Sequence, residues 1–200
     1  MKASEGFQRL WRRGELNLPS PASFFRKTLW RLRGASIGRI RYFPKCSVVW
    51  PHQVRIGNDC ILKHEVFFNY DHYWTPGPSI ILGDRVFIGN AVEFNIQGRI
   101  EIGDDCLIGA KCFFVDHDHG IHSDKTLNRQ PNEIRPIRLG RNVWLGAGCI
   151  VLKGVEVGSG AVIGAGSVLT KSVPENGVWV GNPARPIGLR GQAAPSSQGE

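Results

Sequence analysis

Large apolar residues recur at every sixth position along most of the chain. In the C-terminal half these positions are Leu139, Leu145, Val151, Val157, Ile163 and Leu169. Upstream, the same spacing holds at Leu82, Ile88 and Phe94, at Ile102, Ile108 and Phe114, and more weakly at Ile56 and Leu62. A small or medium residue stands two positions before most of them, and residues two apart in an extended segment share a face. Both columns are therefore expected to point into one narrow core.

A period of six fits neither an amphipathic helix nor a simple hairpin sheet. It predicts a parallel β-helix with three short strands per coil, clearest over about residues 54–170 and forming a domain over residues 46–190. Four of the five cysteines, Cys60, Cys106, Cys112 and Cys149, fall in the column of small residues. We expect them to pack as compact apolar side chains.

The repeat fails in one long segment. From Phe114 to Leu139 the chain runs 25 residues, one more than four periods, and residues 116–136 are polar and rich in turn formers. A smaller slip of two residues lies between Phe94 and Ile102. Functional loops often leave a regular scaffold where its register fails. The sequence therefore predicts an extruded loop over residues 116–136, which carries three of the six histidines: His117, His119 and His122.

The net charge of +8 is concentrated at the start of the chain. Residues 1–45 contain eleven Lys and Arg against two acids, whereas the remaining residues carry fourteen bases against fifteen acids. Because the basic residues are confined to this N-terminal segment, the composition does not favour a nucleic-acid-binding protein. The last ten residues, 191–200, read as a disordered tail.

Residues 20–33 predict a basic amphipathic helix. Ser20 is the expected N-cap, Pro21 the first helical residue, and Gly34 lies past the end. Phe25, Leu29 and Leu32 share one face, with Trp30 beside it. Two interpretations stay open: the helix covers the open end of the β-helix, or it lies on an anionic membrane surface.

The composition also indicates a location. No run of residues is long and apolar enough for a membrane-spanning helix, and the start of the chain lacks the apolar core of a signal peptide. An odd number of cysteines without a framework spacing suits a reducing cytoplasm. We therefore expect a cytoplasmic protein, with the inner face of the membrane as a site of peripheral contact for residues 20–33.

The hexads and the C-terminal segment "GAGSVLTKSVPENGVWVGNPARPIGLR" resemble the hexapeptide-repeat acyltransferases. The likeness extends to the maltose and galactoside O-acetyltransferases and to enzymes that modify lipopolysaccharide and capsule. It implies an all-β fold, a left-handed parallel β-helix, whose handedness opposes the usual crossover rule and comes from the resemblance alone. It further implies acetyl-CoA as donor, a sugar hydroxyl as acceptor, and a homotrimer with sites between subunits.

The resemblance assigns a catalytic base. In the sugar acetyltransferases an essential histidine follows the isoleucine of an "IGDD"-like hexad by about seventeen residues, and counting from Ile102 reaches His119. The spacing of 25 residues between His119 and Trp144 also lies within a residue of the family's spacing. A sugar hydroxyl attacks a thioester poorly unless a base accepts its proton, which imidazole can do near neutral pH. Nothing resembles an activated Ser or Cys nucleophile, so direct attack without an acyl-enzyme is expected.

Further site residues follow from the same likeness. His117, one register step from His119, is the rival base and otherwise a substrate-binding residue. Asn95 matches a family asparagine near the site across a subunit boundary; the alternative is an asparagine ladder or a turn residue. Trp144 resembles a residue that lines the thioester groove, although a tryptophan covering a corner of the β-helix is the alternative.

The cofactor residues are placed by position in the C-terminal hexads. Ala147 and Ala165 would offer backbone N–H groups to the pantetheine arm, because a small side chain lets a ligand approach the backbone. Thr170, Lys171 and Arg185 would meet the phosphorylated nucleotide end. Gly188 stands where the family often has a further arginine, and Arg190 lies two residues beyond.

Other interpretations of the histidine-rich loop remain. Asp116 or Asp118 either orients an imidazole or is a solvated loop acid, and His122 is a loop or substrate-contact residue. The spacing of His117 and His122 also permits a zinc enzyme like the γ-class carbonic anhydrases. We expect no metal, because the pair lies where the regular coils have ended. A β-helix that binds without catalysis is a third possibility.

Overall fold

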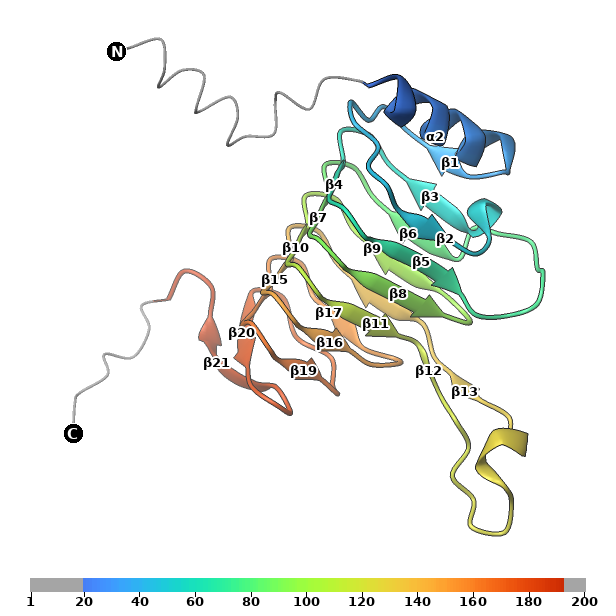
Figure 1. Cartoon of the computed structure of the whole chain (residues 1–200). Helices are drawn as coiled ribbons and strands as arrows, with labels where there is room; N and C mark the ends of the chain where they lie inside the picture. The colour runs from blue at the N-terminus through green and yellow to red at the C-terminus, as the bar shows by residue number, and fades with distance from the viewer. Residues whose placement is uncertain (1–19, 193–200) are drawn as a thin grey trace.

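The computed structural model describes residues 20–192 and consists of coils stacked into a long three-sided column (Figure 1). Residues 1–19 of the basic segment and 193–200 of the expected tail lie outside the described range. Each coil contributes one short strand to each of three sheets, so the residues of one column stack along the axis. This architecture fits the left-handed parallel β-helix of hexapeptide repeats.

The strands of each sheet are parallel, with a single antiparallel partner at the C-terminal end. Sheet A contains β1 (Ser36–Ile37), β3 (Val54–Ile56), β6 (Ile80–Leu82), β9 (Ile100–Ile102), β14 (Ile137–Leu139) and β17 (Glu156–Val157). Sheet B contains β2 (Ser47–Val48), β5 (Phe67–Tyr70), β8 (Glu93–Ile96), β11 (Phe113–Val115), β16 (Ile150–Val151) and β19 (Val168–Leu169). Sheet C contains β4 (Ile61–Leu62), β7 (Phe87–Ile88), β10 (Leu107–Ile108), β15 (Trp144–Leu145), β18 (Val162–Ile163), β20 (Gly177–Val180) and β21 (Arg185–Leu189).

The core is a column of side chains fixed by the register of the strands. Phe68, Phe94 and Phe114 occupy equivalent positions of sheet B, and their rings stack with centroids 5.2 and 5.1 Å apart. All three are fully buried. Because each coil repeats the same two inward columns, the hexad pattern alone specifies which residues touch.

The cysteines of the small column lie in the core, as expected. Cys60, Cys106, Cys112 and Cys149 are buried, and each thiol donates to a backbone carbonyl of the following coil, at sulfur–oxygen distances of 3.1–3.2 Å. Burial raises the pKa of Cys106 to about 11. A buried thiol with a raised pKa, such as that of Cys106, is a poor nucleophile, because the thiolate is the reactive species.

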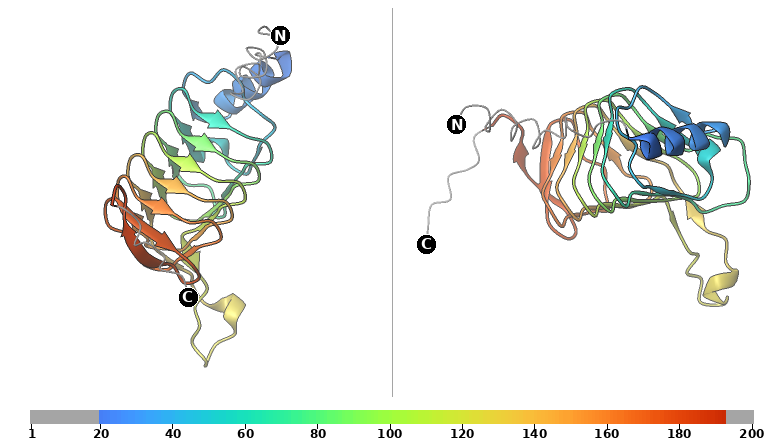
Figure 2. Two further views of the ribbon diagram at one scale, coloured as in Figure 1. Left: turned by 90° about the vertical axis from the view of Figure 1, so that its left-hand side faces the viewer. Right: turned by 45° about the horizontal axis from the view of Figure 1, so that its top comes forward.

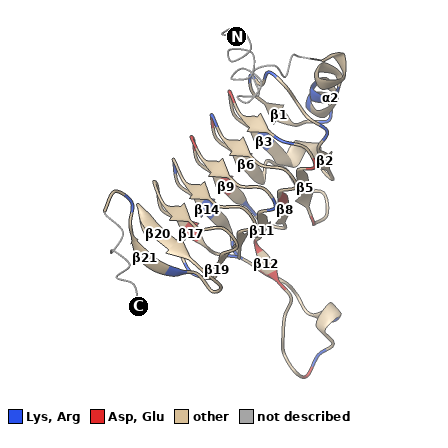
Figure 3. Cartoon of the chain, turned by 60° about the vertical axis from the view of Figure 1, so that its left-hand side comes forward, with Lys and Arg blue, Asp and Glu red and all other residues tan. Residues whose placement is uncertain are grey.

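The corner between sheets A and C carries a ladder of charged and polar side chains (Figure 3). Arg39 pairs with Asp59, Arg85 with Asp105, and Arg141 with Asp104. Here the side chain of one coil accepts the backbone N–H of the coil before it; the Asp84 N–H, for example, donates to Asp104 Oδ1 at 2.9 Å. The backbone of this corner is therefore largely satisfied within the chain.

Helix α2 (Pro21–Leu32) covers the N-terminal end of the column (Figure 2). Ser20 caps it as expected: its side chain accepts the N–H of Ser23 at 3.1 Å. Trp30 packs edge-on against Phe68, with centroids 5.8 Å apart, and so closes the phenylalanine stack. Arg26, Lys27 and Arg31 donate to backbone carbonyls of residues 37–43, which satisfies the exposed edge of the first coil.

The contact made by α2 differs from the one that its apolar face suggests. Trp30 and Ser23 face the column, whereas the stripe formed by Phe25, Leu29 and Leu32 points outward, with Leu32 81% exposed. The basic side chains, which would normally be solvated, reach the open carbonyls of the first coil. The helix is therefore a cap, but its apolar stripe has no partner among residues 20–192.

Between β11 and β14 the chain leaves the column as a hairpin (Figure 1). Its two short strands, β12 (His117–Asp118) and β13 (Glu133–Ile134), pair antiparallel, and the 3-10 turn η2 (Leu127–Arg129) lies in the connection. A second excursion follows β5, where residues 71–79 pass beside the 3-10 turn η1 (Pro51–Gln53) before β6 begins. Both leave the corner between sheets B and A.

Removing one ring from the phenylalanine stack should destabilise the whole column. Phe94→Ala deletes a fully buried ring between two others, so we expect a loss of about 3–5 kcal/mol in the free energy of unfolding, measured by urea denaturation. Phe25→Ala, at a side chain 68% exposed, serves as the control and should change it by about 0.5 kcal/mol or less. Equal losses for both variants would contradict the assignment of the core.

Candidate active site

The site begins with outward-facing side chains of sheet B. Asn69, Asn95 and Val115 occupy equivalent positions of β5, β8 and β11. The Asn69 side-chain amide donates to Asn95 Oδ1 at 3.1 Å, so an asparagine ladder is present. Asn95 also lines the cleft beside the hairpin, where its remaining amide hydrogens and lone pairs face the space that a ligand could fill.

Asp116 is the residue at which the chain turns out of the column. Its carboxylate is fully buried and accepts three backbone N–H groups, those of Gln97, Gly98 and Arg99, at 2.7–2.8 Å. These donors lie in the preceding coil, where two extra residues between Phe94 and Ile102 interrupt the six-residue period. A buried carboxylate is tolerated only when its acceptor capacity is met, and here the irregular turn 97–99 meets it.

Gly98 makes this turn possible by close approach. A Cβ at this position would lie 2.6 Å from the side chain of Ile134 in β13 and 3.1 Å from Asp116 Oδ2. The irregular turn at residues 97–99 therefore packs directly against the base of the hairpin, at Asp116 and Ile134.

His117 is held by the same carboxylate. The ring is only 7% exposed, and Nδ1 lies 3.2 Å from Asp116 Oδ1. Because a carboxylate can only accept, Nδ1 carries the proton and donates it, and Nε2 is the nitrogen left for a ligand. No other group between residues 20 and 192 hydrogen-bonds to this ring.

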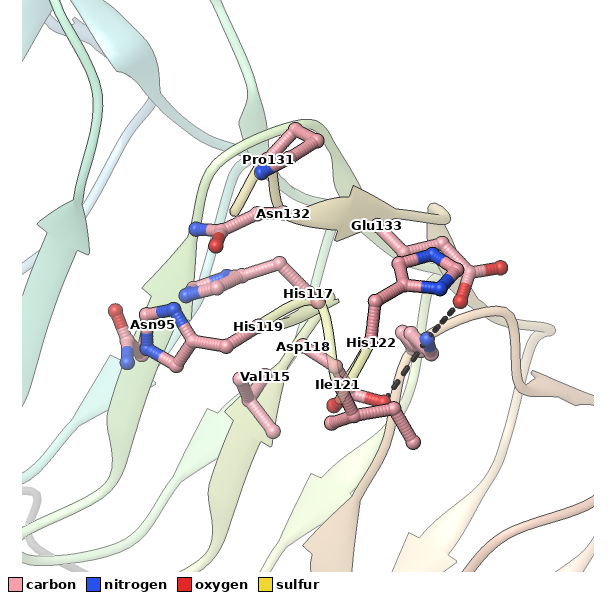
Figure 4. A pocket seen from close by; sticks show the side chains of 12 residues that line it. Asn95, Val115, His117, Asp118, His119, Ile121, His122, Pro131, Asn132 and Glu133 are labelled. Carbon is pink, nitrogen blue, oxygen red and sulfur yellow. Dashed lines mark hydrogen bonds and ion pairs between the residues drawn. The ribbon is translucent and has the colours of Figure 1, made fainter. Parts of the chain in front are cut away.

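His119 lies at the mouth of a cleft of about 810 Å³ that also contains Asn95 and His117 (Figure 4). Its imidazole is exposed and makes no hydrogen bond with any described residue. In Figure 4 the rings of His117 and His119 lie on the side of the cleft where Asn95 stands. The structure thus brings together three of the residues expected from the sequence, with two imidazoles of different environment: one fixed and buried, one accessible.

Lys153, in the coil after the hairpin, forms ion pairs with both strands of the hairpin. Its ammonium lies 2.9 Å from Asp118 Oδ2 on β12 and also pairs with Glu133 on β13. Hydrogen bonds to Glu133 and Asp118 raise the pKa of Lys153, and the cations Lys153 and Arg135 lower the pKa of Glu133. One side chain therefore binds both strands that carry the histidine segment.

His122 lies apart from the other two histidines. In Figure 4 its ring is on the Glu133 side of the cleft. Within the described residues no group of three histidine, cysteine or acidic side chains has the spacing of a metal site. The Nδ1–H of His117 donates to Asp116, whereas the ring of His122 stands on the Glu133 side of the cleft.

The expected cofactor residues lie on other faces of the column. Trp144 is exposed on sheet C, in register with Leu107 and Val162. Ala147 and Ala165 stand at the corner between sheets C and B, with exposed side chains. Thr170, Lys171 and Arg185 are exposed near the C-terminal end. A single chain does not bring any of these residues into the cleft that contains His119.

Among the described residues, the corner that contains Ala147 and Ala165 lacks the side-chain acceptors that bind backbone N–H groups at the corner between sheets A and C. No acceptor in residues 20–192 takes the backbone N–H of either alanine, because the equivalent residue of the following coil has no polar side chain. Gly146 brings these coils close: a Cβ there would lie 2.5 Å from the Ala165 nitrogen. The corner therefore presents a row of unpaired N–H donors that could receive a carbonyl-bearing ligand.

Sequence reasoning missed two contributors, Lys153 and the aromatic run at residues 72–74. Lys153 reaches the hairpin from a coil corner 20 residues beyond Glu133, and no motif marks it. Asp116 is one of the two acids considered from the sequence for orienting an imidazole, and it does contact His117; only its backbone donors, which belong to another coil, carry no sequence signal. The aromatic run "HYW" at residues 72–74 lies in an interruption of the hexads between Phe68 and Leu82, and that interruption was a usable signal.

Two family models match the chain. A model described as bacterial transferase hexapeptide (six repeats) matches residues 136–171, and one described as hexapeptide repeat of succinyl-transferase matches residues 99–122. These segments cover coils on either side of the hairpin, and the match over residues 99–122 also includes β12.

Two curated relatives are informative. WbbJ of Escherichia coli K12, named an O-acetyl transferase of lipopolysaccharide biosynthesis, is 33% identical over 146 residues, which cover 64% of this chain and 74% of that protein. The galactoside O-acetyltransferase of the same strain is 30% identical over 66% of this chain and 62% of its own length. The fold and the repeat define a hexapeptide β-helix protein. The chain belongs to the hexapeptide-repeat acetyltransferase family and is an acyltransferase.

Solved structures support the fold. A hexapeptide-repeat acetyltransferase from Vibrio cholerae, complexed with acetyl coenzyme A, superposes with a TM-score of 0.62 and 22% identity, over 92% of this chain and 87% of that one.

Removing the Lys153 cation should loosen the hairpin. In Lys153→Met we expect faster amide hydrogen exchange at residues 117–119 and 133–134, read by mass spectrometry. Lys125→Met, at an exposed lysine on the same hairpin, is the matched control and should exchange like the wild type.

The pH range of this protection follows from the pKa shifts. A lowered Glu133 pKa gives stabilisation that is present above its unfolded value of about 4.3 and lost as pH falls through the folded value. A raised Lys153 pKa gives stabilisation that is present below about 10.4 and lost as pH rises through the folded value. Protection should therefore be constant between about pH 5 and 10 and decrease with salt. Exchange equal to that of the wild type at every salt concentration would show that Lys153 does not hold the hairpin.

Proposed function

We propose that this protein transfers an acetyl group from acetyl-CoA to a hydroxyl of a saccharide, with His119 as general base. The observation that carries the proposal is the cleft at the root of the hairpin, where His119 stands exposed beside the fixed ring of His117 and the amide of Asn95. The acceptor class is supported by the relatives named for galactosides and lipopolysaccharide, and the donor by the neighbour complexed with acetyl coenzyme A.

In the proposed step the sugar oxygen attacks the thioester carbonyl while His119 accepts its proton. The tetrahedral intermediate then collapses, the carbon–sulfur bond breaks, and the CoA sulfur leaves and takes a proton from the imidazolium. His117 and Asn95 would hold the acceptor: Nε2 of His117 accepts from a hydroxyl, and the Asn95 amide offers both donor and acceptor. His119 is preferred as base because its ring is exposed, whereas that of His117 is buried.

No protein nucleophile is needed for this route. The cysteines of the column are buried and hydrogen-bonded, and the hydrogen bond with the Cys149 thiol, together with burial, raises the pKa of Cys112. The only serine in the small inward column after the hairpin, Ser167, donates its hydroxyl to the Gly164 carbonyl at 2.7 Å. Direct attack on the thioester is therefore favoured over a covalent acyl-enzyme.

The donor would lie along the corner of Ala147 and Ala165. The unpaired backbone N–H groups there suit the amide carbonyls of a pantetheine arm, and Trp144 on the adjoining sheet could cover the thioester. Thr170, Lys171 and Arg185 would contact the phosphates. Arg190 donates weakly to the Gly160 carbonyl at 3.4 Å, so it does not simply replace the family arginine missing at Gly188.

A homotrimer is part of the proposal. The cofactor residues and His119 occupy different faces of one chain, so a complete site requires the cofactor face of one subunit beside the hairpin of another. Three-sided columns offer flat sheets for such packing.

We also propose a role in surface polysaccharide biosynthesis at the cytoplasmic side of the membrane. No helix within residues 20–192 has the length and apolar character to cross a bilayer. The support is the outward stripe of α2, where Phe25, Leu29 and Leu32 are exposed at the end of the column. An apolar helix face with basic residues nearby can bind an anionic lipid surface.

The base assignment is tested by kinetics. His119→Ala should lower kcat for acetyl transfer by about 10² or more, because general-base help is typically worth that much, while acetyl-CoA binding measured by calorimetry stays unchanged. His122→Ala, on the far side of the cleft, is the control and should keep most of the activity. If His117→Ala abolishes transfer and His119→Ala does not, the base is His117.

Membrane contact is tested with vesicles. In Leu29→Gln/Leu32→Gln, co-sedimentation with vesicles of phosphatidylglycerol and phosphatidylcholine should fall on the order of tenfold or more, since burying each leucine contributes about 1.5–3 kcal/mol. Ile187→Gln, an exposed apolar residue at the opposite end of the column, is the control. Binding by the double variant equal to that of the wild type would refute contact through α2.

A further inference from the structure

A second cleft lies on the other side of His119. It has a volume of about 1200 Å³ and runs between the excursion after β5 and the inner side of the hairpin. We call it the aromatic cleft; its lining residues include Trp50, Tyr70, His72, Tyr73 and Trp74 from the first side and Asn128, Gln130 and Asn132 from the second. His119 lines both this cleft and the one that contains Asn95.

The excursion after β5 is held in place by buried groups. Thr75 is its anchor: its carbonyl accepts from the Gln53 side-chain amide at 2.7 Å and from His52 Nε2 at 3.0 Å. Its hydroxyl lies 2.8 Å from that of Tyr70. Gln53 is fully buried, so its hydrogen bond to Thr75 attaches the loop to the interior of the column.

The floor of the aromatic cleft is a chain of hydrogen-bonded polar side chains. Asn132 donates to Gln97 Oε1 at 3.0 Å, and the Gln97 amide approaches Asp71 Oδ2 at 3.4 Å. Asn69 continues the floor and donates to Asn95, which belongs to the other cleft. Polar side chains therefore line both clefts, and Asn132 and His119 line each of them.

The walls of this cleft carry two large aromatic side chains in solvent. Tyr73 is 85% exposed and Trp74 is 63% exposed. The Trp74 ring leans over His52, with centroids 5.6 Å apart, which leaves its other face uncovered. Tyr and Trp side chains combine an apolar ring face with a polar O–H or N–H, so they suit ligands that have both apolar surfaces and hydrogen-bonding groups.

The charge of the cleft narrows the class of ligand. Among the lining residues within 20–192, Asp71 is the only acidic one and none is a lysine or arginine. A multiply negative ligand such as a nucleotide or CoA would have no cation to meet there. Sugar rings match it: their C–H faces pack on aromatic rings, and their hydroxyls both donate to and accept from amides.

We propose that the aromatic cleft binds the neutral sugar residues that adjoin the acetylated one, so that the acceptor is an oligosaccharide and not a single sugar. The inference rests on the proposed function for the position of the reacting hydroxyl, at His119, where the two clefts meet. Tyr73 and Trp74 then determine specificity for chain length without touching the reacting atoms.

The test uses the full chain on an array of neutral mono-, di-, tri- and tetrasaccharides, followed by acetyl-transfer assays on the glycans bound. Tyr73→Ala/Trp74→Ala should lower affinity and kcat/KM for tri- and tetrasaccharides on the order of tenfold or more, mainly through KM, and change those for monosaccharides less than about twofold. Trp74→Phe, which keeps an aromatic face, should retain most of the affinity. Leu127→Ala removes an exposed apolar side chain of the same hairpin outside the cleft and should behave like the wild type.

Three results would overturn the proposal: no oligosaccharide bound by the wild type, binding unchanged in the double variant, or a changed subunit number in the double variant by analytical ultracentrifugation. The last would make the aromatic residues a subunit contact. Failure of the aromatic-cleft proposal can be distinguished from failure of the proposed acetyl-transfer function. Glycan binding without acetyl transfer would refute only the activity, and transfer unaffected by Tyr73→Ala/Trp74→Ala would refute only the aromatic cleft.

Discussion

The site depends on one buried carboxylate. Asp116 stands at the end of β11, where a regular hexad would turn the corner into the next strand of sheet A. Instead its two oxygens take the N–H groups of residues 97–99 from the coil below. Those N–H groups are free to donate because that coil is two residues out of register. The irregular turn 97–99 in one coil and the exit of the chain at Asp116 in the next coil are therefore stabilised by the same three hydrogen bonds.

The consequences reach the chemistry directly. Since Asp116 also binds Nδ1 of His117, the group that anchors the hairpin also orients an imidazole. Lys153 holds the same hairpin from the opposite direction, by its pairs with Asp118 and Glu133. His119 lies one residue beyond Asp118, between these two attachments and the exposed tip. A side chain in that position is supported by fixed neighbours yet remains accessible, which is what a general base needs.

The regular part of the molecule was predictable from the sequence because each hexad repeats the same local contacts. Once Leu145 and Ile163 are known to be equivalent, their pairing follows, and so does the burial of Cys149 and Ser167. The N-cap of α2 followed from Ser20 for a similarly local reason. The orientation of α2 did not, because Trp30 finds its partner Phe68 only when the coil is closed. Lys153, the aromatic cleft and the backbone donors of Asp116 escaped for the same reason: each depends on contacts between segments at least 17 residues apart.

The two clefts at His119 differ in a way that separates two tasks. The cleft with Asn95 contains His117, the Lys153 pairs and a small set of polar groups, so it presents fixed hydrogen bonds around one point. The aromatic cleft presents broad rings and amides along a length of surface, with a single carboxylate. Directed polar groups fix the orientation of a reacting hydroxyl, whereas aromatic faces bind ring after ring with little demand on orientation. A base located where these surfaces join would react with one hydroxyl of a chain whose neighbouring sugars are held independently. The two surfaces are also connected: the Gln97 side chain links Asp71 to Asn132, and the Gln97 backbone N–H donates to Asp116, the anchor of the hairpin.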